Sequence, residues 1–229
     1  LNLAAPMGQQ IVVDNRPTVL IADIVAKSPP DGYTILLTGS AHWMAPLTEK
    51  VNYDPIRDFA AITLVDRSPN VLVVHPSVPA KGVRDLLAIA KARPSELNVA
   101  VGGAGSSNDV AAVLFAYLGG VKLTRVPYKG NGPAMTALLS GEVQVMFSSS
   151  GAVAPHMQSG RLRALGVGSQ KPSPLAPGLL PISSSLPGYQ SEALHAVFAP
   201  ARTPPAIVTR LNTEIGRYLR GTQAREVFL

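Results

Sequence analysis

The 229-residue chain has no cysteine, few aromatic residues and no long apolar run. The absence of cysteine excludes disulfides, thiolate metal ligands and cysteine nucleophiles, and it suits an exported protein. Asp, Lys, Arg, Pro or Gly interrupts every apolar stretch before it reaches the roughly 18 residues that a membrane-spanning helix needs. The sequence therefore predicts no membrane span.

Charged residues make up only 15% of the chain and hydrophobic residues 46%, which predicts a folded globular protein. The 20 Lys and Arg exceed the 14 Asp and Glu, and this balance favours anionic partners such as small carboxylates, nucleic acid or an acidic surface. The basic residues are scattered and aromatics, which stack on bases, make up 5%. We therefore expect no nucleic-acid partner, and a solvated basic surface is the alternative to a small-anion ligand.

Short β-branched runs alternate with helical patterns along most of the chain. The predicted strands are 10–13, 34–37, 61–65, 71–75, 97–101, 143–147, 163–167 and 194–200. The predicted helices are 82–94, 106–120 with Ser106 or Ser107 as its cap, and 203–220 with Thr203 as its cap and Pro204 at its first position. The Pro-rich segment 172–188 predicts a long surface loop. This alternation predicts an α/β fold with a largely parallel sheet.

Three loops share one design, because each follows a strand, is rich in Gly and Ser or Thr, and leads into a helix. They are TGSAH (38–42), GGAGSSND (102–109) and YKGNGPA (128–134). A helix start offers unpaired N–H groups and a positive dipole end, and ligands of open α/β sheets bind beyond the carboxyl ends of the strands. The loops predict an anion site, with a capped helix after a tight turn as the alternative for each. FSSSGA (147–152) likewise offers hydroxyls to a polar ligand or caps a helix.

Motifs for catalysis and nucleotide binding are missing. The segment 102–109 has Asn108 where a dinucleotide fingerprint needs its third glycine, and the chain has neither G-K-[ST] nor G-x-S-x-G. The four histidines, His42, His75, His156 and His195, are too dispersed to predict a metal site. We expect no enzyme activity and no metal, and a Ser/His/Asp triad assembled only in space is the open alternative.

Seven segments then form a family pattern along nearly the whole chain. They are GQQIVVDNRP (8–17), PDGYTILL (30–37), YDPIRDFAAITLV (53–65), VPYKGNGPAMTALLSGEVQVMF (126–147), GRLRALGV (160–167), LPGY (186–189) and FAPARTPPAIVTRLN (198–212). Together they resemble the substrate-binding receptors of tripartite tricarboxylate transporters, the Bug-type proteins. The combination of DNRP, DGYT, YKG and APARTP is specific for this family.

The resemblance implies a periplasmic receptor with a two-lobed type II periplasmic binding protein fold, each lobe a mostly parallel sheet flanked by helices. Its first lobe would comprise 1–99 plus 198–229 and its second lobe 100–197. A small organic acid would bind in the interlobe cleft and be delivered to integral-membrane transporter subunits. The resemblance also implies a monomer, no cofactor and no catalysis. An effector-sensing domain of a transcription regulator with a similar fold is the alternative, and a hydrolase is a weaker one.

Matched to the family's motifs, the chain has candidate ligand-binding residues in four places. They are Thr38, Gly39, Ser40 and Ala41; Gly105, Ser106, Ser107 and Asn108; Tyr128, Lys129 and Gly130; and Ser148 and Ser149. Hydroxyl and amide donors suffice for a carboxylate, since charge-assisted hydrogen bonds are roughly twice as strong as neutral ones. Lys129 has solvent exposure as its alternative.

The chain also departs from the family pattern. Asp109 stands where the family often has histidine, and Leu194-His195 where it often has an aromatic pair. An acidic Asp109 disfavours a second carboxylate unless its side chain points away. Thr18 follows the NRP motif where the family has a glycine-rich turn, and the first residue is leucine, so we expect a processed or trimmed product.

Overall fold

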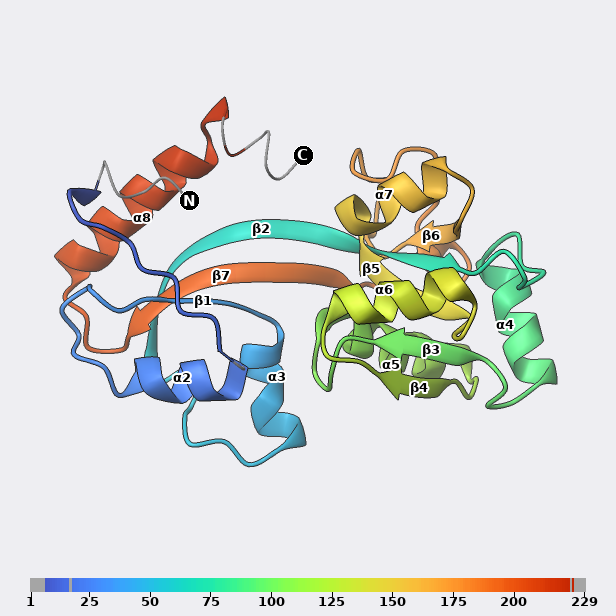
Figure 1. Ribbon diagram of the computed structural model, residues 1–229, viewed down its shortest axis with the longest axis horizontal. Helices are drawn as coiled ribbons and strands as arrows, with labels where there is room; N and C mark the ends of the chain where they lie inside the picture. Colours follow the sequence, from blue (N-terminus) through green and yellow to red (C-terminus); the bar gives the residue numbers. More distant parts are fainter. Residues whose placement is uncertain (1–6, 17, 223, 225–229) are drawn as a thin grey trace. The chain divides into compact units, whose positions relative to one another are not determined.

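The structure is a computed structural model that describes residues 7–16, 18–222 and 224 (Figure 1). It divides into two compact units, Leu1–Arg67 with Leu194–Leu229, and Ser68–Ala193. The boundaries fall inside strands β2 (Phe59–Val74) and β7 (Glu192–Pro200), so each of these strands belongs partly to each unit. Residues 68–99, which the sequence prediction puts in the first lobe, belong to the second unit.

The first unit is built on three strands in the order β1 (Leu36–Gly39), β7 and β2. β1 and β7 are antiparallel, and Gly39 faces His195 across the pair. Helix α8 (Pro205–Leu219) packs Leu211 and Ile215 against these strands, while α2 (Thr18–Ala26) packs in a second cluster with Leu36. Figure 1 shows α8 on one side of the strands and α2 with α3 (Ala41–Thr48) on the other.

A histidine lies in the middle of the second cluster of this unit. The His42 ring stacks on Tyr53 with centroids 5.2 Å apart and meets the edges or faces of Phe59 and Phe198 at 4.6 and 5.2 Å. His42 is only 1% exposed, and neither of its ring nitrogens has a hydrogen-bond partner among the described residues. Burial without a partner disfavours the imidazolium and lowers the pKa of His42 to about 4.

The second unit is a mixed sheet with a parallel centre. The strands run in the order β2, β5 (Val145–Ser149), β3 (Asn98–Val101) and β4 (Thr124–Pro127), and β6 (Arg163–Val167) also pairs with β2. β3 is parallel to β4 and β5, whereas β2 is antiparallel to β5 and β6. The helices are α4 (Val83–Ala92), α5 (Ser107–Gly119), α6 (Asn131–Ser140) and α7 (Ser150–Gln158), with a 3-10 turn at Ile182–Ser184.

The core of this unit lies on both faces of the sheet. Val71 and Val73 of β2 enter a cluster with α6 and α7, and Leu72 and Val74 enter another with α4 and α5. All four are fully buried, because successive side chains of a strand point to opposite faces and helices cover both. The apolar run VLVV is thus a strand buried on two sides.

Most predicted elements are confirmed, including the strand 163–167 and the helices that appear as α4, α5 and α8. The division of 61–65 and 71–75 into two strands is wrong, because the chain stays extended through Pro69 in the 16-residue β2. The predicted strand 10–13 is wrong, since these residues have no regular structure. Thr203 does not cap α8, because its hydroxyl donates to the Pro200 carbonyl at 2.8 Å and Pro204 precedes the first helical residue. No described helix is long and apolar enough to cross a membrane.

The neutral state of His42 predicts a loss of stability in mild acid. In the unfolded chain this histidine takes up a proton below about pH 6.5, whereas in the fold it does so only near pH 4, so stability falls as the pH drops through this window by up to about 3 kcal/mol. His42→Phe, which does not titrate, should flatten that part of the pH profile of the free energy of unfolding, measured by urea denaturation. The control His156→Gln, at a half-buried histidine of α7, should keep the wild-type slope. An unchanged slope in His42→Phe would contradict this account.

Candidate ligand-binding site

Three helices of the second unit begin at the same edge of its sheet. β3, β4 and β5 are parallel, and each leads at its carboxyl end into a helix, α5, α6 and α7 respectively. Their N-cap positions are Ser106, Gly130 and Ser149, and none of these makes a side-chain cap bond in the part of the chain that is described. The N-cap side chains therefore leave the first-turn N–H groups of all three helices uncapped. With three positive dipole ends, this edge favours an anion.

The first two of these loops are bonded to each other. Gly130 donates its backbone N–H to the Gly102 carbonyl at 3.2 Å, and Asn108 donates from Nδ2 to Asn131 Oδ1 at 2.8 Å. A Cβ on Gly102 would lie only 3.2 Å from Asn131 Oδ1, so a side chain here would crowd this approach. The structure thus brings together the predicted groups 105–108 and 128–130.

Within the first loop, side chains organise the backbone. The Ser106 hydroxyl lies 2.6 Å from the Gly103 carbonyl and also within hydrogen-bond distance of Asn108 Oδ1. Asn108 Oδ1 further accepts from the Gly102 N–H at 3.2 Å. Ser107, the first helical residue, accepts a hydrogen bond at its carbonyl from Asn70 of β2. Ser106 and Asn108 therefore hold the loop in place, whatever they do for a ligand.

The end of β5 joins this region through β2. Ser149 faces Asn70 in the antiparallel β2–β5 pair. Asn70, fully buried, donates from Nδ2 to Ser191 Oγ at 2.7 Å and reaches the Ser107 carbonyl at 3.4 Å. Asn70 Oδ1 and Ser148 Oγ are buried without a partner among the described residues, so Asn70 Oδ1 can still accept a hydrogen bond and Ser148 Oγ can still accept or donate one.

Asn70 is a residue that the sequence prediction missed, as are Asn131 and Ser191. The available signal for Asn70 was an amide placed directly before the buried run VLVV of the same strand. Its partner Ser191 is 121 positions away, and no periodic pattern indicates such a pair.

Asp109 is tied to the first loop and to a basic residue. Its Oδ2 accepts from the Gly105 N–H at 3.0 Å, and its Oδ1 accepts from Arg125 Nη1 at 2.7 Å. The Asp109 side chain is 8% exposed and that of Arg125 51%. A cavity of about 390 Å³ lies beside the pair and includes Ala104. The negative charge of Asp109 is thus compensated, so that it need not oppose an anion at the helix starts.

The tyrosine-lysine turn is oriented differently from the other loops. Tyr128 donates its hydroxyl to Glu142 Oε1 at 2.9 Å. Partial desolvation, and then the bond to Glu142, raise the pKa of Tyr128. Lys129 is exposed, and Gly130 has φ +100°, a backbone conformation that favours glycine. The Tyr128 hydroxyl therefore makes its hydrogen bond to another residue of the same unit.

The predicted residues of the first unit form one turn. Thr38 is buried near the end of β1 and Gly39 ends this strand. Ser40 occupies the N-cap position of α3 without a side-chain cap bond, and Ala41 begins the helix. His195 lies opposite Gly39 on β7. This turn repeats, within its own unit, the strand–hydroxyl–helix design of the second unit.

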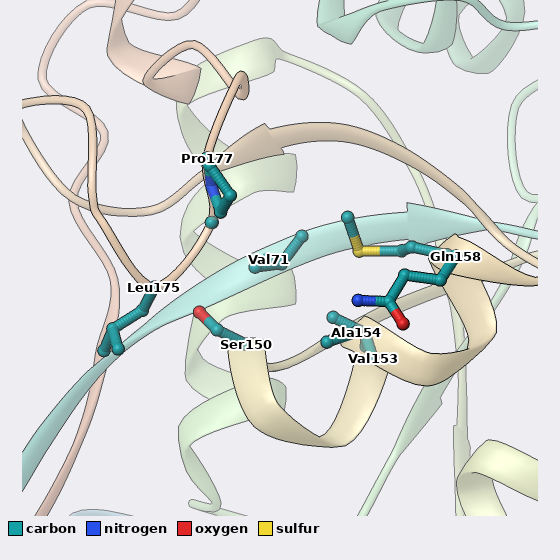
Figure 2. Close-up of a pocket in the computed structure, with 9 residues that line it drawn as sticks. Val71, Ser150, Val153, Ala154, Gln158, Leu175 and Pro177 are labelled. Carbon is teal, nitrogen blue, oxygen red and sulfur yellow. The ribbon is translucent and has the colours of Figure 1, made fainter. Parts of the chain in front are cut away.

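A separate, mainly apolar cavity of about 290 Å³ lies alongside α7 in the second unit (Figure 2). Val153 and Ala154 of α7, Val71 of β2, and Leu175 and Pro177 line much of it. Ser150 and Gln158 add polar groups to its lining. It contains none of the predicted ligand-binding residues. Within the described residues, no group of three or more His, Asp or Glu could hold a metal ion.

Comparisons with known proteins agree on one family. The sequence model described as "Tripartite tricarboxylate transporter family receptor" matches residues 1–228. Among solved structures, Rpa4515 of R. palustris with adipate is 35% identical with a TM-score of 0.88, covering 96% of this chain and 76% of that one. MatC of Rhodopseudomonas palustris with bound malate is 30% identical with a TM-score of 0.88, covering 97% and 78%. The periplasmic binding protein BugD is 27% identical with a TM-score of 0.87, covering 98% and 77%.

The predicted α/β fold of the periplasmic binding protein type is thereby confirmed. The chain spans about two thirds of the length of the curated relatives that it matches.

The contacts of Asp109 predict that it stabilises the first loop. Asp109→Ala removes a charged acceptor from the Gly105 N–H and leaves Arg125 unpaired, so the free energy of unfolding should fall by about 2 kcal/mol in urea denaturation. Asp109→Asn, which keeps an acceptor oxygen, should lose less. The control Asp14→Ala breaks an exposed ion pair with Arg16 and should lose less than about 0.5 kcal/mol. Equal losses in the two alanine variants would contradict the role of Asp109.

Proposed function

We propose, since the chain belongs to the tripartite tricarboxylate transporter receptor family, that it is an extracytoplasmic receptor for a small organic acid. The relatives with adipate and malate support a carboxylate ligand. The ligand is released unchanged, because the receptor performs no chemistry on it. It is delivered to the integral-membrane subunits of a tripartite transporter by a monomeric receptor in the periplasm, and the interlobe position of the ligand stays a prediction.

The gathering of three uncapped helix starts in the second unit is the observation that carries this proposal. A carboxylate bound there would accept from backbone N–H groups and from the hydroxyls at the ends of β3 and β5. Such bonds are charge-assisted, and ordered water can complete them, so that no arginine clamp is needed. Ser149 is the best placed of these hydroxyls, because it stands at the start of α7 and its side chain makes no cap bond.

In the first unit we propose that Thr38, Gly39, Ser40 and Ala41 contribute through the turn that starts α3. Ser40 again has a hydroxyl at the N-cap position that is not used for capping. In the second unit the proposed set is Gly105–Asn108, Tyr128–Gly130, Ser148 and Ser149, to which Asn70 is added as a neighbour of Ser149. The contribution of Tyr128 is through its backbone, since its hydroxyl is bound to Glu142.

A thermal-shift and calorimetric panel of mono- and dicarboxylates tests the proposal. Adipate or malate should raise the melting temperature, because a ligand that binds the native state alone stabilises it by mass action. Ser149→Ala should raise the dissociation constant about tenfold, because one hydrogen bond to a charged group is lost. The control is Ser159→Ala at the other end of the same helix, whose hydroxyl bonds the Pro155 carbonyl, and it should bind as wild type.

Two outcomes would contradict the proposal at different levels. If no acid shifts the melting temperature of the folded protein, the carboxylate class is wrong. If an acid binds but Ser149→Ala and Ser159→Ala bind it equally well, the acid is right and the site at the helix starts is wrong. Proton NMR of the recovered ligand should show it unchanged.

A further inference from the structure

A histidine of the first unit stands beside the turn Thr38–Ala41. His195 on β7 is paired with Gly39 on β1, and these strands are adjacent in the sheet (Figure 1). A Cβ added to Gly39 would lie 3.2 Å from His195 Cδ2 and 3.3 Å from Nε2. The Nε2 side of the imidazole therefore covers Gly39, and it does so closely because this residue has no side chain.

The other ring nitrogen of His195 is held by an acid. Nδ1 lies 3.0 Å from both carboxylate oxygens of Asp66 on β2. The side chains of His195 and Asp66 are 49% and 30% exposed, so the ring is fixed in orientation but still accessible. With Nδ1 engaged, Nε2 is the nitrogen that is left for a ligand.

The charge environment favours the protonated ring. The ionisable side chains of the three strands are Asp66 and Arg67 of β2 and Glu192 and His195 of β7, while β1 has none. The hydrogen bond to Asp66 raises the pKa of His195, against the smaller opposing effect of burial. In the imidazolium, Nε2 carries a proton and can donate it to a carboxylate in a hydrogen bond. In the neutral ring with its proton on Nδ1, Nε2 has a lone pair and repels a carboxylate.

We infer that His195 is a specificity-determining residue that donates from Nε2 to one carboxylate of a dicarboxylate. The inference rests on the proposed function and deepens it, because it names the residue that would select a ligand with a second carboxylate. A purely structural role, in which the pair only fastens β7 to β2, predicts different binding data.

The test compares adipate with hexanoate, which has the same chain length but one carboxylate. Dissociation constants are measured by calorimetry at about pH 6 and about pH 8.5, on either side of the ordinary histidine pKa of about 6.5. Wild type should bind adipate about tenfold more weakly at the higher pH, as the donor proton is lost. His195→Gln should bind adipate about tenfold more weakly at the lower pH, with no further pH dependence, and should bind hexanoate as wild type does.

Two further variants keep the test sharp. His156→Gln on α7 replaces a histidine outside all the predicted ligand-binding loops and should retain the wild-type pH dependence. Asp66→Asn keeps the histidine but removes the acid that favours its protonation, so the weakening of adipate binding should move to lower pH. This variant tests the inference even if His195→Gln does not fold.

The outcomes separate the inference from the proposed function. If wild type binds none of the acids, the proposed function is wrong and the inference falls with it. If wild type binds adipate and His195→Gln binds it equally, the receptor stands and the role of His195 is overturned. Equal weakening of adipate and hexanoate in His195→Gln would also overturn it, because that result means a structural role.

Discussion

Burial of β2 on both faces is the constraint from which the second unit follows. Val71 to Val74 have no exposed surface, and their alternating side chains enter two separate clusters. Helices must therefore cover both sides of the sheet, α4 and α5 on one and α6 and α7 on the other. Because α5, α6 and α7 each follow one of the parallel strands β3, β4 and β5, their N-termini lie at one edge. The anion-favouring edge is a consequence of how the core is covered.

The same strand also fixes the details of this edge. Asn70 directly precedes the buried run, and an amide at zero exposure must find partners inside the fold. It finds them in Ser191 Oγ and, at longer distance, in the carbonyl of Ser107 at the start of α5. Gly168 approaches so closely here that an added Cβ would meet the Ser191 and Asn70 carbonyls. Core packing and the position of the first helix start are therefore coupled through one side chain.

Local patterns predicted most of the fold, and non-local hydrogen bonds account for most of what they missed. The run VLVV and the apolar stripe of α8 are readable because burial repeats with a fixed period. The continuity of β2 was not readable, because a proline usually interrupts a strand, and here it is accommodated within 16 extended residues. The loops of the candidate site were readable from their glycines and hydroxyls, and from the family resemblance. Their internal partners were not, since the pairs Asp109–Arg125 and Tyr128–Glu142 are 16 and 14 positions apart and follow no periodic pattern.

The contacts of Asp109 and of His195 show how the hydrogen-bond partners of a charged group decide what it can do. Near a bound anion, an unpaired Asp109 would be repulsive by about 4 kcal/mol at 4 Å with the effective dielectric of a protein surface. Its carboxylate is instead buried and accepts hydrogen bonds from Gly105 N–H and from Arg125, so its charge stabilises the loop. The Asp66–His195 pair is half exposed, and its acid engages only one ring nitrogen. A carboxylate with both oxygens engaged inside its loop organises that loop, whereas a histidine with one ring nitrogen left to donate can also select the ligand and respond to pH.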